Sequence, residues 1–213
     1  MKIKMWISRV ILLLVGLTIA HLGVTLFLQA DLGSDPFNVL IQGLFRFIPW
    51  PAAVTHGMVH MGVSFMIILV LLVVDRTYIR IGTLLCMILG GPIIDFFTLI
   101  LGSIINNESA MVLRVCALVA GCVILACGMS IVIKSQAGTG PNDLVAVVIS
   151  DKSRKKFGIV RIIVDVCFAG IGFAFGGTVG LGTVICAFLV GPTAQIFMPT
   201  AEKICNRFGA EKV

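Results

Sequence analysis

The sequence carries one pattern of glycines and prolines twice. Four positions of the first half recur at a constant spacing of 105 (from 16 to 121): Gly16, Gly23, Gly33 and Pro36 return as Gly121, Gly128, Gly138 and Pro141. A second stretch, residues 82–92, recurs as residues 182–192, at a spacing of 100. In hydrophobic chains such duplication is a recurring design of transporters, whose site lies between the two copies. The repeat therefore predicts a fold built from two similar halves.

The composition places this fold in a membrane. Hydrophobic residues make up 59% of the 213 positions and charged residues only 12%, whereas soluble domains carry about 25% charged residues. The apolar runs reach the roughly 20 residues that a helix needs to cross a bilayer. We predict an all-α, polytopic helix bundle whose six spans cover about residues 6–28, 55–74, 81–104, 110–133, 157–175 and 181–199.

Two shorter segments, about residues 36–47 and 141–150, follow the first and fourth spans. Each begins with Gly-x-x-Pro, in which the glycine ends one helix and the proline starts the next. Because each segment is too short to cross a bilayer, we expect broken or interfacial helices there. The residues expected to interrupt helices are Gly33, Pro36, Pro92, Gly138, Pro141 and Pro192.

The basic residues predict the orientation. With the N-terminus in the cytoplasm, 14 of the 16 lysines and arginines fall on cytoplasmic segments, and only Arg46 and Arg114 fall outside. This distribution follows the positive-inside rule. We expect a multi-pass protein of the bacterial cytoplasmic (inner) membrane with both termini cytoplasmic. The net charge of +6 is thus a topology signal, and no nucleic-acid partner is expected.

The number of spans in each copy is odd. We predict one membrane domain over residues 1–213, with repeats at about 6–104 and 110–200 and a short cytoplasmic tail at 201–213. Since each repeat has three spans, the second copy must enter the membrane from the opposite side, which makes the repeats inverted.

The glycine and proline motifs also suggest a family. The segments 33–38 and 138–143, together with the Gly-Pro pairs at 91–92 and 191–192, resemble the YczE/YitT-like family of bacterial integral membrane proteins. The resemblance covers nearly the whole chain. It implies a small polytopic membrane protein, and it brings neither a substrate nor catalytic residues.

Polar side chains cluster at the starts of the two short segments: Asp35, Asn38, Asn142 and Asp143. Helix starts at membrane depth carry exposed N–H groups and line protein or water-filled cavities. One interpretation is a central site for a substrate or a coupling cation. The other is that Asp35 and Asp143 are ordinary helix caps, and the sequence leaves both open.

Ionisable residues within the spans form a second set of candidates. Asp95 and Gln195 occupy equivalent positions after the two Gly-Pro pairs, and Asp95 has no partner nearby in sequence. Asp165 lies four residues after Arg161, so the two share a helix face and can pair. His60 aligns with Arg161 in the other copy, and these three form a candidate gating or charge group.

A secondary transporter of an unidentified small polar solute accounts best for these features. The alternatives are a substrate-capturing subunit of a multicomponent importer, or a membrane sensor or scaffold that transports nothing. No GxSxG, HExxH or CxxC motif is present, so we expect no enzymatic activity, no cofactor and no metal. The expected partners are the lipid bilayer, the solute and, in a homodimer, a second copy.

Overall fold

Every regular element is a helix within the residues that the computed structural model describes, 2–33, 35–54, 56–101 and 109–208. Six helices are long and apolar enough to cross a membrane, which confirms the predicted spans. The expected ends at residues 55 and 104 lie outside the described residues. The long helices are α1 (Lys2–Gln29), α3 (His56–Asp75), α4 (Ile81–Leu101), α5 (Met111–Lys134), α7 (Phe157–Ala174) and α8 (Leu181–Arg207).

The two short helices begin where the sequence predicts. Helix α2 (Pro36–Phe47) and helix α6 (Pro141–Ser153) each start with proline. The glycines three residues earlier, Gly33 and Gly138, have φ angles of 132° and 136°. Residues with a Cβ rarely adopt this conformation. The Gly-x-x-Pro motif therefore marks two sharp turns, and α6 continues three residues beyond its predicted end.

The expectation that Pro92 and Pro192 interrupt helices is wrong. Both prolines lie inside continuous helices, and α8 passes Pro199 as well and runs on to Arg207. A proline removes one backbone hydrogen bond, but neighbouring groups satisfy the freed carbonyl in membrane helices. The part of the expected tail from residue 201 to 207 thus belongs to α8.

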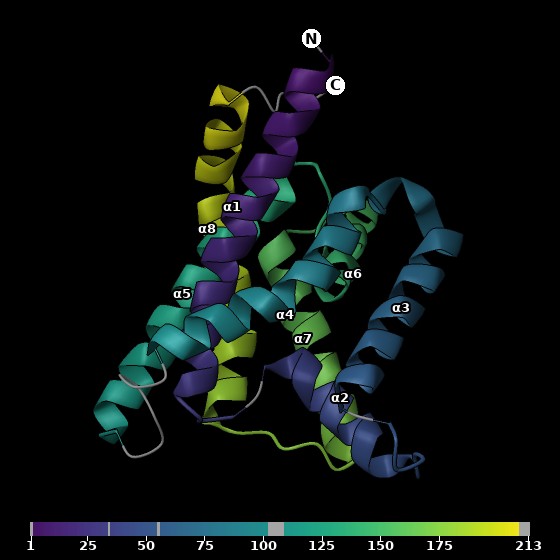
Figure 1. Ribbon diagram of the computed structural model, residues 1–213, viewed down its shortest axis with the longest axis vertical. Helices are drawn as coiled ribbons and strands as arrows, with labels where there is room; N and C mark the ends of the chain where they lie inside the picture. Colours follow the sequence, from purple (N-terminus) through teal and green to yellow (C-terminus); the bar gives the residue numbers. More distant parts are fainter. Residues whose placement is uncertain (1, 34, 55, 102–108, 209–213) are drawn as a thin grey trace.

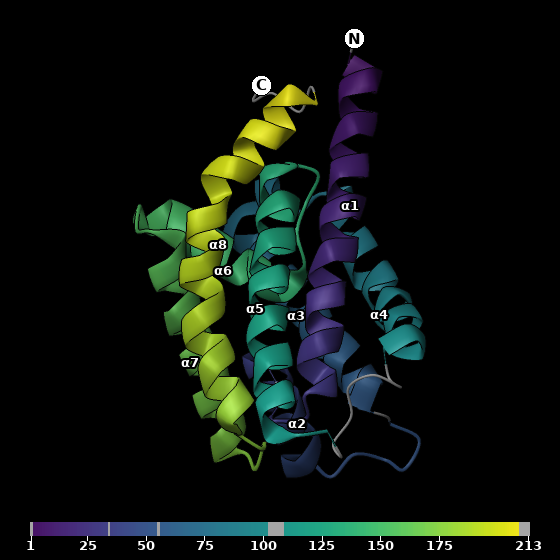
Figure 2. The same cartoon turned by 90° about the vertical axis from the view of Figure 1, so that its left-hand side faces the viewer.

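A seam of glycines joins α1 and α5 at the centre of the bundle (Figure 2). A Cβ placed on Gly128 would lie 2.2 Å from the backbone nitrogen of Ala20, and one on Gly23 would lie 2.4 Å from that of Leu125. Small residues of this kind let the backbones of two membrane helices approach closely. The glycines shared by the two copies therefore hold the central helix pair together.

The other helices surround this seam. Helix α4 packs on α1, α8 packs on α5, and α7 lies against α2, α6 and α8. The remaining long helix, α3, packs on α2 and α6, and after the short 3₁₀ helix η1 (Arg76–Tyr78) the chain enters α4. The start of α1 and the end of α8 lie at one end of the molecule, which we call the terminal face (Figure 1).

Candidate functional site

Helix α7 carries two charged side chains in the interior of the bundle. The side chains of Arg161 and Asp165 are only 8% and 1% exposed, and Arg161 Nε donates a 2.8 Å hydrogen bond to Asp165 Oδ2. The pair is the i, i+4 contact that the spacing allows. Removing such charges from water is costly unless they are well paired, so the neighbours of this pair matter.

A second carboxylate reaches Arg161 from the start of α6. Asp143 Oδ1 accepts a 2.5 Å hydrogen bond from Arg161 Nη1. Its side chain is 20% exposed, so the contact lies at the edge of the buried region. Sequence reasoning missed this contact because the two residues are 18 positions apart and meet only when α6 folds back against α7. The guanidinium therefore bridges two carboxylates.

The start of α2 brings a third carboxylate to the same region. Asp35 caps α2 by accepting hydrogen bonds from the backbone N–H groups of Phe37 and Asn38, and the Asn38 side chain donates to its other oxygen. Phe37, in the first turn of α2, packs against Phe168 of α7, one turn after Asp165. The two broken-helix starts thus converge on the middle of α7.

The charges of this cluster do not balance. The region holds three carboxylates and one guanidinium, which contacts two of them, and the two helix starts each contribute about half a positive charge. About one negative charge remains. In addition, Asp165 Oδ1 is buried and has no hydrogen-bond partner within the described residues. The arrangement can accept one positive charge and a hydrogen-bond donor.

Two further predicted residues lie beside the cluster. Gln195 Oε1 accepts a 3.1 Å hydrogen bond from the backbone N–H of Gly158, one turn before Arg161. Asn142 Oδ1 lies 3.1 Å from the position of a Cβ on Gly140, at the uncapped start of α6. Gln195 therefore lies at the start of α7, and Asn142 lies at the start of α6.

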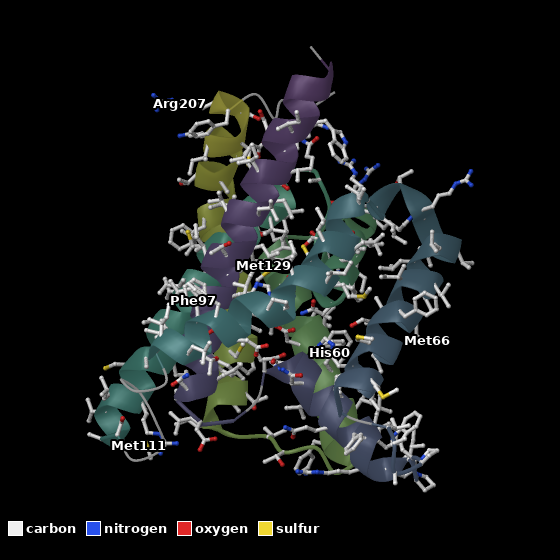
Figure 3. All side chains as sticks on the ribbon, viewed as in Figure 1. His60, Met66, Phe97, Met111, Met129 and Arg207 are labelled. Atoms are coloured by element: carbon white, nitrogen blue, oxygen red, sulfur yellow. The ribbon has the colours of Figure 1, made fainter. Side chains whose placement is uncertain are left out.

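The first copy contributes an aromatic wall. The His60 ring packs edge-on against Phe37, with 5.2 Å between ring centroids, and Phe37 lies 5.5 Å from Phe168 of α7. His60 stands where α3 approaches α2 and α7 (Figure 3). These rings connect α3 to the helix that carries Asp165.

Asp95 does not join this cluster. Its side chain is exposed on the outside of α4, and a Cβ on the neighbouring Gly91 would meet nothing within 4 Å. Within the described residues α3 and α4 do not pack against each other, so this face of α4 stays uncovered. Of the predicted binding and charge-pair residues, Asp95 alone is exposed.

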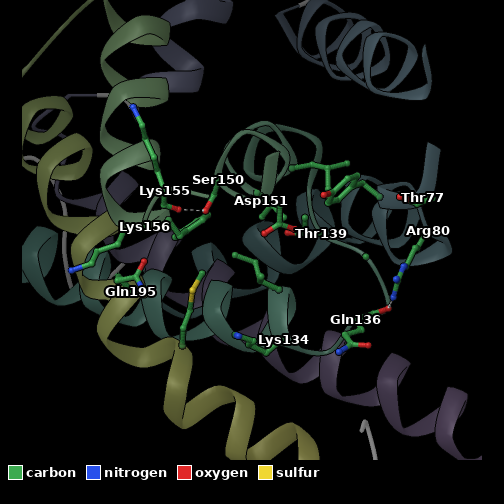
Figure 4. A pocket seen from close by; sticks show the side chains of 17 residues that line it. Thr77, Arg80, Lys134, Gln136, Thr139, Ser150, Asp151, Lys155, Lys156 and Gln195 are labelled. Carbon is green, nitrogen blue, oxygen red and sulfur yellow. Dashed lines mark hydrogen bonds between the residues drawn. The ribbon is translucent and has the colours of Figure 1, made fainter. Parts of the chain in front are cut away.

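A cavity of about 530 Å³ opens near the terminal face beside the cluster (Figure 4). Its lining includes four basic residues and one acidic residue, Asp151. Thr139 and Gln195 also line it. Thr139 lies four residues before Asp143, and Gln195 is bonded to Gly158, one turn before Arg161. The cavity therefore leads from the terminal face towards the charged cluster. Its basic residues are Arg80, Lys134, Lys155 and Lys156.

The comparisons with known proteins agree with a membrane bundle of this size. The model of a family of unknown function, DUF6198, matches residues 7–199. The chain belongs to this family. Relatives of the chain in Bacillus subtilis include the uncharacterized membrane protein YczE, 26% identical over 90% of this chain and 86% of YczE, and the uncharacterized protein YyaS, 25% identical over 89% of this chain and 92% of YyaS.

A third relative, an uncharacterized protein of Haemophilus influenzae, is 29% identical over 88% of this chain and 82% of its own length. The YczE match confirms the resemblance that the glycine and proline motifs indicate. No solved structure matches the chain at a significant level. The relatives therefore support location and architecture, and the chemistry of the site rests on its own residues.

Proposed function

We propose that this protein is a secondary transporter that moves a small polar solute by alternating access between two inverted repeats. The observation that carries the proposal is a set of contacts between the two halves. Each contact occurs twice, and the two halves exchange residues in the second occurrence. In a pair of copies related by a twofold axis, a contact between residue i of one and j of the other implies the contact between j and i. The helix seam and the two sharp turns both satisfy this condition.

The seam obeys the rule at a spacing of 105. Gly16 faces Gly128, where a Cβ on Gly16 would lie 2.9 Å from the Gly128 carbonyl oxygen. The equivalent residues are Gly121 and Gly23, and a Cβ on Gly121 would lie 2.7 Å from the Gly23 carbonyl oxygen. The two crossings of α1 and α5 are thus the same contact with the copies exchanged.

The turns before α2 and α6 obey it as well. Gly82 N–H donates to the Ala137 carbonyl at 2.9 Å, and Gly182 N–H donates to the Leu32 carbonyl at 2.7 Å. Residues 82 and 182 are equivalent, and so are residues 32 and 137. Each turn is therefore held by the third span of the opposite copy, α4 for the turn before α6 and α8 for the turn before α2. Three spans in each copy put the twofold axis in the membrane plane, which is the design of inverted-repeat transporters.

The charged cluster stands where such transporters place their site. Asp165 is the ninth of the 18 residues of α7, near the middle of a span, and both broken-helix starts contact α7 within one turn of it, through Asp143 and Phe37. Discontinuous helices at mid-membrane bind substrates and coupling ions in this architecture. We infer that the cluster holds the solute and the positive charge that moves with it.

The two halves differ in how their second and third spans pack, and this difference indicates a second conformation. Helix α8 packs on α7, with the Cβ position of Gly191 3.0 Å from the Arg161 Cβ. The equivalent positions on α4 and α3, Gly91 and His60, belong to helices that do not pack against each other within the described residues. In the second state we expect α3 to close on α4 and α7 to leave α8. With the proposed orientation, the cavity at the terminal face then belongs to the inward-facing state.

Closure of α3 on α4 also removes an electrostatic cost. A carboxylate that faces hydrocarbon costs at least about 2.5–3.5 kcal/mol. In the present state Asp95 is exposed on α4, whereas its counterpart Gln195 is bonded to the backbone of α7. Closure would give Asp95 the covered environment that Gln195 already has.

Cysteine cross-linking tests the second state. The variant His60→Cys/Gly91→Cys, in a background with the exposed Cys116 and Cys167 replaced by serine, should form a disulfide in membranes under mild oxidation. The reason is that its counterpart pair, Arg161 and Gly191, has Cβ positions 3.0 Å apart, close to the separation that a disulfide requires. Gel mobility with and without reductant measures the cross-linked fraction.

The control pair is Gly62→Cys/Gly91→Cys. Gly62 lies two residues beyond His60 and therefore points away from it on α3. A Cβ on Gly62 meets nothing within 4 Å, so the substitution should be tolerated. If the His60/Gly91 pair forms no more disulfide than this control, the alternating-access proposal is contradicted.

A further inference from the structure

Two buried threonine hydroxyls on segments that touch each other have no hydrogen-bond partner within the described residues. Thr83 is 0% exposed and Thr139 is 3% exposed, and neither Oγ1 is bonded to any described residue. Their segments touch, because a Cβ on Gly138 would lie 2.5 Å from the Thr83 backbone nitrogen and Thr139 is the next residue. Buried hydroxyls are almost always satisfied in native proteins. Two such groups at one contact therefore call for a ligand.

Two further side-chain oxygens lie beside Gly140, the residue that follows Thr139. Asp143 Oδ1 is taken by Arg161, but its Oδ2 lies 3.8 Å from the Cβ position of Gly140, and Asn142 Oδ1 lies 3.1 Å from the same point. Asn142 and Asp143 thus present oxygens beside Gly140, and the turn that carries Thr139 contacts the start of α4 through Gly138.

The counterpart of Thr83 in the other half is satisfied by its own segment. There Thr183 Oγ1 accepts a 3.2 Å hydrogen bond from the Gly180 N–H. Gly140 is replaced by Asp35, whose carboxylate caps α2. The unpartnered hydroxyl of Thr83 is therefore not a general consequence of this turn. The turn that it contacts lines the cavity through Thr139.

We infer that Thr83, Thr139, Asn142 and Asp143 form a binding site for a monovalent cation, Na⁺. The donors are hard oxygens, which hard cations prefer. Only one carboxylate oxygen contributes, whereas Ca²⁺ and Mg²⁺ sites usually combine more charge or phosphate oxygens. One Na⁺ matches the single negative charge left in the cluster. The binding site rests on these contacts, whereas the assignment of Na⁺ as the coupling ion rests on the proposed function.

Equilibrium binding of ²²Na⁺ to the purified full chain in detergent tests the site. The wild type should bind Na⁺ saturably, and Na⁺ should raise its melting temperature above the values in K⁺ or choline at equal ionic strength. The variant Thr83→Val/Thr139→Val should bind Na⁺ about tenfold or more weakly, because contacts to a charged group are worth at least that factor. Valine keeps the shape of threonine and removes only unpartnered hydroxyls, so the fold should persist.

Thr183→Val is the matched control. It removes a buried hydroxyl that has a partner, so it should lower the melting temperature and leave the Na⁺ affinity unchanged. Equal Na⁺ affinity in the wild type and in Thr83→Val/Thr139→Val overturns the site, as does equal stabilisation by choline. If the double variant does not fold, Thr139→Val alone must weaken Na⁺ binding. Loss of Na⁺ binding leaves the His60/Gly91 cross-link unaffected, and a missing cross-link leaves Na⁺ binding unaffected, so the two proposals fail separately.

Discussion

Replacing Arg161 by glutamine should lower the free energy of unfolding by about 3–5 kcal/mol, the usual loss when one partner of a buried charge pair is removed. The guanidinium bridges Asp143 and Asp165. Without it, the carboxyl group of Asp165, whose side chain is 1% exposed, would lose its charged partner in an apolar interior. Chemical unfolding in detergent, followed by circular dichroism, measures the change.

Lys134→Gln is the control for Arg161→Gln. Lys134 Nζ pairs with Glu202 Oε2 at 2.6 Å, but the two side chains are 27% and 37% exposed, and partly exposed pairs contribute about 0–1 kcal/mol. Comparable losses in the two variants would show that the Arg161 cluster is not desolvated.

A double-mutant cycle separates the ion pair from the fold. In the Arg161→Gln background, Asp165→Asn should restore part of the lost stability, because it removes the carboxylate that has become unpaired. In the wild type the same change should be destabilising. The expected coupling energy is about 0.5–3 kcal/mol, as for other residues in direct contact. Additive effects would mean that the two side chains do not depend on each other.

The predictable part of this fold is the part that short stretches of sequence determine. Six apolar runs of sufficient length specified the spans, and Gly33 and Gly138 marked the turns because only glycine adopts their positive φ angles readily. The expected helix breaks at Pro92 and Pro192 were wrong because a proline's effect depends on what surrounds its helix. Both helices continue past the proline.

The site was harder to predict because it depends on how helices pack. Asp143 and Arg161 were both candidates, but their contact exists only because α6 folds back on α7. Asp95 and Gln195 occupy equivalent places in the repeat and yet have opposite environments, exposed and hydrogen-bonded. No local pattern distinguishes them, because the difference comes from whether α3 or α7 covers the helix. Thr83 and Thr139 gave no signal at all, since an unpartnered hydroxyl is recognised only once its neighbours are known.

Replacing Gly128 by valine should lower the free energy of unfolding by about 3 kcal/mol, the upper end of the range for overpacked sites. A Cβ at this position would lie 2.2 Å from the Ala20 nitrogen and 2.6 Å from the Gly16 carbonyl oxygen. Both obstacles are backbone atoms, which cannot rotate away, so α1 must move relative to α5. The same unfolding measurement in detergent reports the loss.

Gly62→Val and Gly23→Val complete this test. A Cβ on Gly62 meets nothing within 4 Å, so its replacement should change stability by less than about 0.5 kcal/mol, as is usual for exposed positions. Gly23 is the counterpart of Gly128 in the other copy, and its Cβ would lie 2.4 Å from the Leu125 nitrogen. If the two copies are related by a twofold axis, Gly23→Val should be as damaging as Gly128→Val. A large loss at only one of the two positions would mean that the seam does not have the symmetry on which alternating access between the repeats depends.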